Sequence, residues 1–182
     1  MGILLFVAAL AASAGSFAQG PYDTSVGAPR VLYVVSEAVT GRAEPDLRSP
    51  ALFRLRPYDV VSGRQLAKGW LKVDPATLAG TAESGWIPVA PDDLVTTTLE
   101  ELQRRVFRVQ QTKWPDRVKM DVVRGRIRLG FTAIQVQLAL GDPQSKALRR
   151  AADDVAEEWT YDDRRIVFSH TGVAAIELLE DR

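Results

Sequence analysis

The spacing of apolar and polar residues predicts short strands in the first half of the chain. From Val31 onward, runs rich in β-branched and aromatic residues lie between Pro and Gly residues, as is typical of strands. The stretch 36–50 is polar and contains Pro, so we expect a long loop there. Such short strands need a closed sheet to protect their edges, which predicts a small β-barrel. The expected strands cover residues 31–36, 51–55, 58–61, 70–73 and 86–89.

Helical spacing begins in the second half. Thr98 and Glu101 form a capping-box pattern ahead of an apolar stripe, so we expect an amphipathic helix that ends before Trp114. Pro115 suits the start of a further helix, and Gly125 would stop it. The same segment also fits a strand, because apolar residues alternate along it at Val118, Met120 and Val122.

A third helix, barely two turns long, is expected between Thr132 as its N-cap and Gly141 as its stop. So short a helix is marginal alone in water, and it must therefore pack against another element. We expect that element to be an antiparallel meander in which Trp159 is buried, with segment 144–154 as a polar linker before it. The expected strands of the meander cover residues 158–161, 166–168 and 173–179.

The first 18 residues are apolar and then small, which is the pattern of a secretory signal peptide cleaved after Ala18. Residues 19–28 would then form a linker. No Lys or Arg precedes the apolar run, so a mis-assigned start codon and a retained anchor stay open as alternatives. The run is, however, shorter than the roughly 20 residues of a spanning helix. We expect a periplasmic or secreted protein without a stable membrane anchor after cleavage.

Composition excludes several kinds of chemistry. The 23 basic residues equal the 23 acidic ones, so no overall field favours nucleic acid as a partner. The chain has no Cys and a lone His170, so we expect no catalytic triad, no metal site and no cofactor. An acidic cluster at 153–163 could serve hydrolysis, but its carboxylates lie on a linker and one hairpin. Hydrolysis by this cluster stays open as a third interpretation.

Two strand-opening segments, Gly69-Trp70 and Gly85-Trp86, repeat one pattern. Together with segments 39–45 and 54–61 they resemble the bacterial SH3-type domain, whose motifs include N-V-R-x-x-P and L-x-x-G-x-x-V segments at these places. The resemblance implies that residues 29–94 form a small all-β, SH3-like barrel. It also implies that the barrel binds cell-wall peptide or another extended peptide in a surface groove.

The candidate ligand-binding residues of this barrel are Arg42, Glu44, Tyr58, Trp70 and Trp86. A Trp that opens a strand of a small barrel also suits the core, because Trp is highly buried on average. A solvated loop would equally explain the two charged residues. Both interpretations therefore remain open for these positions.

The second half carries a further set of motif residues. They resemble the SmpA/OmlA (BamE-like) outer-membrane assembly lipoproteins and their relatives with the β-lactamase-inhibitor-like fold. The resemblance implies that residues 95–182 form helices packed on an antiparallel meander, and hence an α+β chain overall. This chain lacks the lipidated Cys of those lipoproteins, so a related envelope adaptor is implied instead. The residues that carry the resemblance are Gly130-Phe131-Thr132, Val136, Leu140-Gly141, Pro143, Trp159, Tyr161, Phe168, Gly172 and Val173.

The sequence therefore predicts an exported, non-enzymatic adaptor of the cell envelope. Its barrel would bind peptide or peptidoglycan, and its BamE-like module would dock a protein partner. The alternative, suggested by the inhibitor-like fold, is an inhibitor or accessory subunit of a cell-wall hydrolase.

Overall fold

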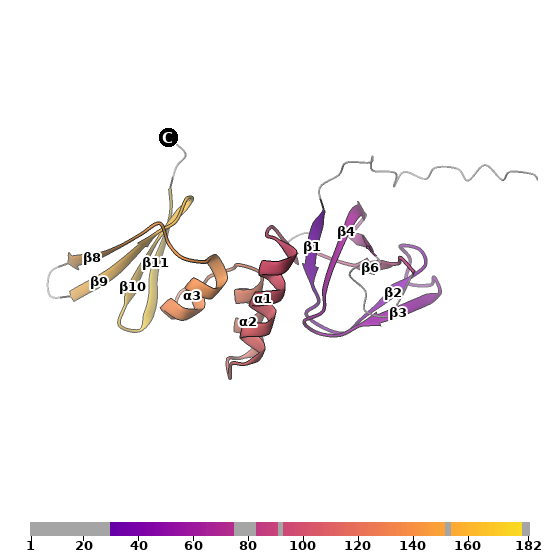
Figure 1. Cartoon of the computed structure of the whole chain (residues 1–182), viewed down its shortest axis with the longest axis horizontal. Helices are drawn as coiled ribbons and strands as arrows, with labels where there is room; N and C mark the ends of the chain where they lie inside the picture. The colour runs from indigo at the N-terminus through magenta and orange to yellow at the C-terminus, as the bar shows by residue number, and fades with distance from the viewer. Residues whose placement is uncertain (1–29, 75–82, 91–92, 152–153, 180–182) are drawn as a thin grey trace, which may run out of the picture.

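The computed structural model describes residues 30–74, 83–90, 93–151 and 154–179. The signal peptide and linker expected over residues 1–28 lie outside these ranges. The described residues form two antiparallel sheets and three helices, so the chain is an α+β protein. Figure 1 shows the helices between the two sheets along the long axis of the molecule. Among the described residues, no helix is long and apolar enough to cross a membrane.

The first sheet contains β1 (Val31–Val34), β2 (Val39–Arg42), β3 (Ala51–Leu55), β4 (Val60–Ala67), β5 (Trp70–Val73), β6 (Trp86–Pro88) and β7 (Leu94–Val95). The helices are α1 (Leu99–Gln110), α2 (Asp116–Val123) and α3 (Ala133–Leu140). The second sheet contains β8 (Ser145–Ala151), β9 (Asp154–Thr160), β10 (Arg164–Ser169) and β11 (Gly172–Leu178).

The first sheet has the strand order β3-β2-β6-β5-β4-β1-β7. The strands expected at 51–55 and 70–73 are confirmed. The long loop expected at 36–50 is wrong, because it contains β2, which pairs with both β3 and β6. This strand is short and polar and contains Gly41, against whose backbone the Phe53 ring packs. Backbone pairing rather than an apolar pattern therefore specifies β2.

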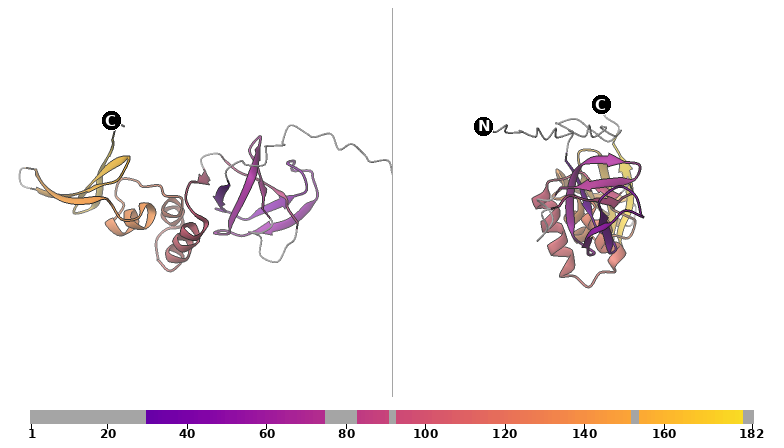
Figure 2. Two further views of the ribbon diagram at one scale, coloured as in Figure 1. Left: turned by 45° about the horizontal axis from the view of Figure 1, so that its top comes forward. Right: turned by 90° about the vertical axis from the view of Figure 1, so that its right-hand side faces the viewer.

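Strand β1 is buried on both of its faces. Tyr33 and Val35 point into a core that the first sheet builds with its own side chains. Leu32 and Val34 point the other way and share one apolar cluster with the buried residues of α1. Two further views show α1 and α2 packed between the sheets (Figure 2). The two halves expected from sequence are therefore joined through a continuous apolar core.

The helices begin where the sequence predicts. Thr98 accepts a hydrogen bond from the Glu101 amide at 3.2 Å, which caps α1. Segment 116–123 is a helix and not a strand, and it ends before Gly125, whose φ is +71°. Thr132 and Gln135 form the reciprocal capping box of α3.

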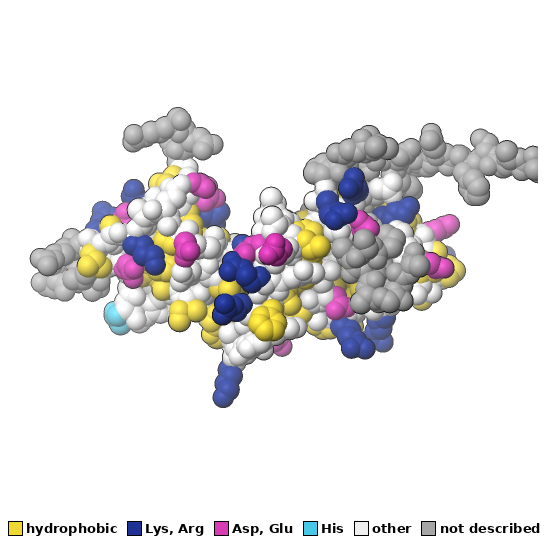
Figure 3. Space-filling view, viewed as in Figure 1, with side chains coloured by type: hydrophobic (Ala, Val, Ile, Leu, Met, Phe, Trp, Pro, Cys, Tyr) yellow, Lys and Arg dark blue, Asp and Glu magenta, His cyan; other side chains and the backbone are white. Residues whose placement is uncertain are grey.

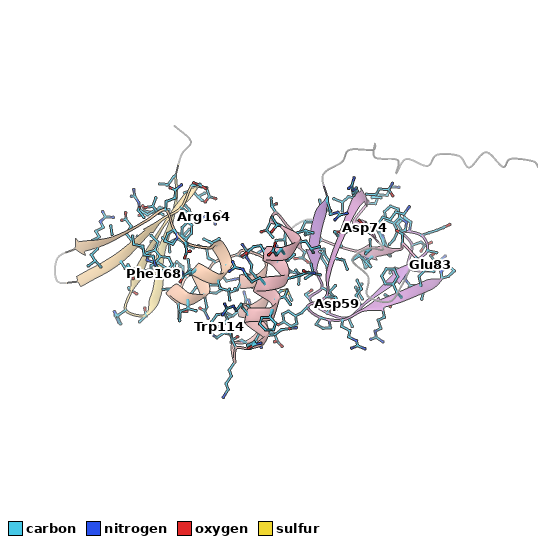
Figure 4. The ribbon with its side chains drawn as sticks, viewed as in Figure 1. Asp59, Asp74, Glu83, Trp114, Arg164 and Phe168 are labelled. Carbon is cyan, nitrogen blue, oxygen red and sulfur yellow. The ribbon has the colours of Figure 1, made fainter. Side chains whose placement is uncertain are left out.

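The second sheet has the order β11-β10-β9-β8. Trp159 of β9 is 3% exposed, and its ring lies 4.8 Å from that of Phe168 between centroids. Phe168 lies on the side of the sheet that faces α3 (Figure 4). The predicted burial of Trp159 in the cluster that holds α3 is therefore confirmed.

The prediction of a polar linker at 144–154 is wrong. Residues Ser145–Ala151 of this segment form β8, which pairs with β9 over the whole length of the strand. The side chains of residues 145–149 are all exposed. Strand β8 is held by backbone hydrogen bonds at the edge of the sheet, so it does not need alternating apolar side chains. Its sequence therefore shows no such alternation.

Tyr161 follows β9 and holds the end of α3. Its side chain is buried, and its hydroxyl donates a 3.1 Å hydrogen bond to the Gly141 carbonyl. Burial, and then the charge of Asp142, raises the pKa of Tyr161 from 10.0 to about 12. The neutral phenol is therefore favoured in the folded protein.

The raised pKa of Tyr161 predicts a loss of stability in alkali. The contribution of the neutral phenol is complete below pH 10 and is lost as the pH rises toward 12. We expect the unfolding free energy to fall between these values, and to fall less steeply in the Tyr161→Phe variant. Tyr33 and Tyr58 also have raised pKa values, so part of the fall should remain. Urea denaturation measured at several pH values tests this, and an identical fall in both proteins contradicts it.

Candidate functional site

A cleft of about 430 Å³ lies where the first sheet meets α2, and we call it the joint cleft. Loops of the first sheet contribute one wall, and α2 with the segment after it contributes the other. Four of its residues are Arg and two are Asp, so its surface is charged and largely basic. Its lining residues are Ser36, Pro57, Tyr58, Asp116, Arg117, Met120, Asp121, Arg124, Arg126 and Arg128.

Tyr58 connects the two walls. It lies in the turn between β3 and β4 with a φ of +72°, and Asp59 stabilises the turn by accepting a 2.7 Å hydrogen bond from the Arg56 amide. Figure 4 shows Asp59 at the end of the sheet nearest the helices. The Tyr58 hydroxyl donates to the Asp116 carboxylate at 3.2 Å. Burial, and then the Asp116 charge, raises the pKa of Tyr58.

Arg124 forms a fixed part of the cleft wall. Its side chain is only 9% exposed and makes a 2.8 Å ion pair with Asp93. It also donates to the Val34 carbonyl of β1 at 3.4 Å, and its buried Nε has no hydrogen-bond partner among the described residues. Arg126 lies 3.6 Å from the same Asp93 carboxylate. One carboxylate therefore faces two guanidinium groups.

Arg128 is held by a different carboxylate. Its Nε and one terminal nitrogen donate to the two oxygens of Asp121 at 2.6 and 3.0 Å. Asp121 is buried at the end of α2, and the hydrogen bonds and charge of this pair raise the pKa of Arg128. Arg117, in contrast, is exposed and has no ion-pair partner within the described ranges.

A second cleft, of about 320 Å³, lies at the rim of the first sheet, and we call it the rim cleft. It combines apolar walls with acidic groups and shares Ser36 with the joint cleft. Burial, and then the charge of Asp93, raises the pKa of Tyr33 on its floor. The lining residues are Tyr33, Ser36, Glu37, Ala38, Val39, Pro88, Val89, Ala90 and Asp93.

The five candidate residues do not gather at one site. Arg42 donates to the Ser49 carbonyl at 2.7 Å and is paired in register with Trp86, which is buried. Glu44 is exposed in the loop after β2, and Trp70 is half-buried opposite Pro88. Of the five, Tyr58 alone lines either cleft, and it lies at the joint.

The arginines of the joint cleft are the functional candidates that sequence reasoning missed. Arg124, Arg126 and Arg128 alternate directly after the Gly-stopped helix, and that spacing is the signal that could have indicated them. The sequence contains no sign that the turn at Tyr58 packs beside them, because that turn lies more than 60 residues before Arg124. The net charge of the whole chain is zero, so the composition does not reveal this group of arginines either. Figure 3 shows the same mixture, with basic and acidic side chains interspersed over the face in view.

The described part of the chain shows no cluster of side chains arranged as a catalytic or metal site. Those residues contain no group of three or more His, Cys, Asp or Glu side chains that could hold a metal ion. His170 is exposed in the turn between β10 and β11. In the acidic segment, Glu158 forms ion pairs with Arg149 and Arg165, as charged residues of neighbouring strands commonly do.

Comparison of the chain with protein-family models, with curated proteins and with solved structures finds no match. The resemblances to SH3-type and BamE-like domains therefore depend on the sequence motifs alone.

Proposed function

We propose that the chain is an exported, non-enzymatic binding protein of the cell envelope. In this proposal an SH3-like barrel, built by the first sheet, binds peptide or peptidoglycan, and a BamE-like module docks a protein partner. The observation that carries the proposal is the rim cleft. It is a cleft on the first sheet with apolar walls and an acidic group, Glu37, that has no ion-pair partner among the described residues, and both features suit a peptide with an amino group.

The lining of the rim cleft suits an extended peptide. Ala38, Val39 and Pro88 offer apolar surface that can cover a small side chain. Glu37 is exposed at the edge and has no ion-pair partner within the described ranges. The charge of Asp93, in contrast, is already balanced by Arg124. Glu37 is therefore the group available to an amino group, such as that of the diamino residue in peptidoglycan stem peptides.

Titration of the ¹⁵N-labelled full chain with a synthetic stem peptide that has a free amino group tests this. We expect amide shift changes at residues 36–39, 89 and 90, and about fivefold weaker binding in the Glu37→Gln variant, since exposed charge pairs contribute up to about 1 kcal/mol. Glu44→Gln is the matched control, because Glu44 is an exposed carboxylate outside the cleft. Absence of binding, or equal losses in both variants, removes the rim cleft as the site.

Exposed apolar residues beside α3 support the second half of the proposal. Leu129 and Ile134 are 67% and 69% exposed and lie on either side of the α3 cap. Such side chains suit a protein contact, and a cell-wall hydrolase is the partner in the alternative function. Cross-linking in cell extract distinguishes the two functions. A stoichiometric complex that inhibits the enzyme favours the alternative, and Ile134→Asp is expected to weaken either complex.

A further inference from the structure

We propose that the joint cleft is a second binding site, distinct from the rim cleft, that takes the carboxylate of an acidic peptide. The cleft volume of about 430 Å³ lies within the range of pockets that hold small ligands. It is large enough for one carboxylate side chain with part of its backbone. Neither wall alone forms the site, so a bound ligand would contact both the first sheet and α2.

The charge balance of the joint cleft leaves two positive charges unmatched. Its four arginines and Lys119, which lies 3.9 Å from the Asp116 carboxylate of the lining, face the three carboxylates of Asp116, Asp121 and Asp93. Arg128 is paired with Asp121, and Arg124 is paired with Asp93. Arg117 and Arg126 are therefore the two guanidinium groups with donors left for a ligand.

Much of the basic wall is already ordered without a ligand. Arg124 is held at once by Asp93 and by the Val34 carbonyl, and Arg128 is held by two hydrogen bonds to Asp121. These two arginines therefore form a fixed wall beside Arg117 and Arg126, and this wall loses little conformational entropy when a ligand arrives. Guanidinium groups also match the planar fork of a carboxylate, as the Arg128 pair within the cleft illustrates.

A carboxylate is the group that the arginines of this cleft already bind. Asp121 accepts two hydrogen bonds from Arg128, and Asp93 faces both Arg124 and Arg126. A ligand carboxylate would accept hydrogen bonds from Arg117 and Arg126 in the same way. The Tyr58 hydroxyl already donates to Asp116 and thereby fixes the opposite wall.

The test is an NMR titration of the ¹⁵N-labelled full chain with two capped peptides, acetyl-Ala-Glu-Ala-amide and acetyl-Ala-Gln-Ala-amide. The Glu peptide is expected to shift the arginine Nε signals of the joint cleft and the amides of Ser36 and Tyr58. The Gln peptide is expected to leave them unchanged. In the Arg117→Ala/Arg126→Ala variant the Glu peptide should bind at least about tenfold more weakly, because hydrogen bonds to charged groups are lost.

Arg108→Ala is the matched control, since Arg108 is an exposed arginine of α1 outside the cleft. Its binding of the Glu peptide is expected to equal that of the wild type. Arg117→Glu, at an exposed position, is a second variant for the case that the double substitution disturbs folding. The proposal is overturned if the Glu peptide fails to bind at millimolar concentration, if the Gln peptide binds equally, or if Arg108→Ala loses as much. Tighter binding of inorganic phosphate in the same cleft also overturns it.

Discussion

Replacing Trp159 with Ala is expected to lower the unfolding free energy by about 3 to 5 kcal/mol, which is the usual cost of truncating a buried Trp. The indole is almost fully enclosed and packs on Phe168. Its Nε1 donates to Glu157 at 2.7 Å, and the Lys146 ammonium lies 4.0 Å from the ring centroid. The substitution therefore opens a cavity and removes a hydrogen bond and a cation–π contact.

Urea denaturation of the full chain measures the effect. Trp114→Ala is the control, because that residue is half-buried at the edge of the same apolar cluster and should cost clearly less. A Trp159→Ala variant within about 1 kcal/mol of the wild type would show that the indole does not anchor this half of the molecule.

The second large effect is expected at Gly172, where β11 begins. Gly172 has a φ of +124°, and a Cβ there would lie 2.8 Å from the carbonyl oxygens of Gly130 and Phe131. These residues lead into α3 and are bound to β11 by two hydrogen bonds of 2.8 Å, one in each direction, with Val173. Gly172→Ala would push the two segments apart and strain the backbone. We expect a loss of about 3 kcal/mol.

The Gly130→Ala variant separates the cost of backbone strain from the cost of a steric clash. Gly130 also has a positive φ, +82°, but no atom lies within 4 Å of its added Cβ. We therefore expect a loss of only about 1 kcal/mol from backbone strain. Thermal and urea unfolding of the two variants should differ clearly. Equal losses would mean that the contact between Gly172 and the entry to α3 does not hold the helix on the sheet.

The elements that could be predicted from sequence are those specified by local rules. The third helix has a capping residue, an apolar face and a stop within ten residues, and Trp159, for which the sequence predicts a strand, lies near the end of β9. Strands β2 and β8 lack such signals. The first is short and contains Gly41, and the second has its described side chains in solvent, so only backbone pairing with neighbours specifies them.

The candidate site was less predictable than the fold. Tyr58 could be singled out as a binding candidate, but its contact with Asp116 on α2 depends on how the first sheet packs against the helices. That packing uses the outer face of β1, whose residues Leu32 and Val34 appear in the sequence as ordinary strand residues. The alternating arginines that follow α2 could be recognised from the sequence. Their position beside the first sheet could not.

Binding to cell-wall material without turnover is the central claim, and incubation of the full chain with purified peptidoglycan sacculi tests it most directly. Sedimentation measures retention of the protein, and mass spectrometry of the supernatant measures released muropeptides. We predict saturable retention that the Glu37→Gln substitution weakens, with no release of muropeptides. A protein that stays in the supernatant, or one that releases soluble fragments, contradicts the account.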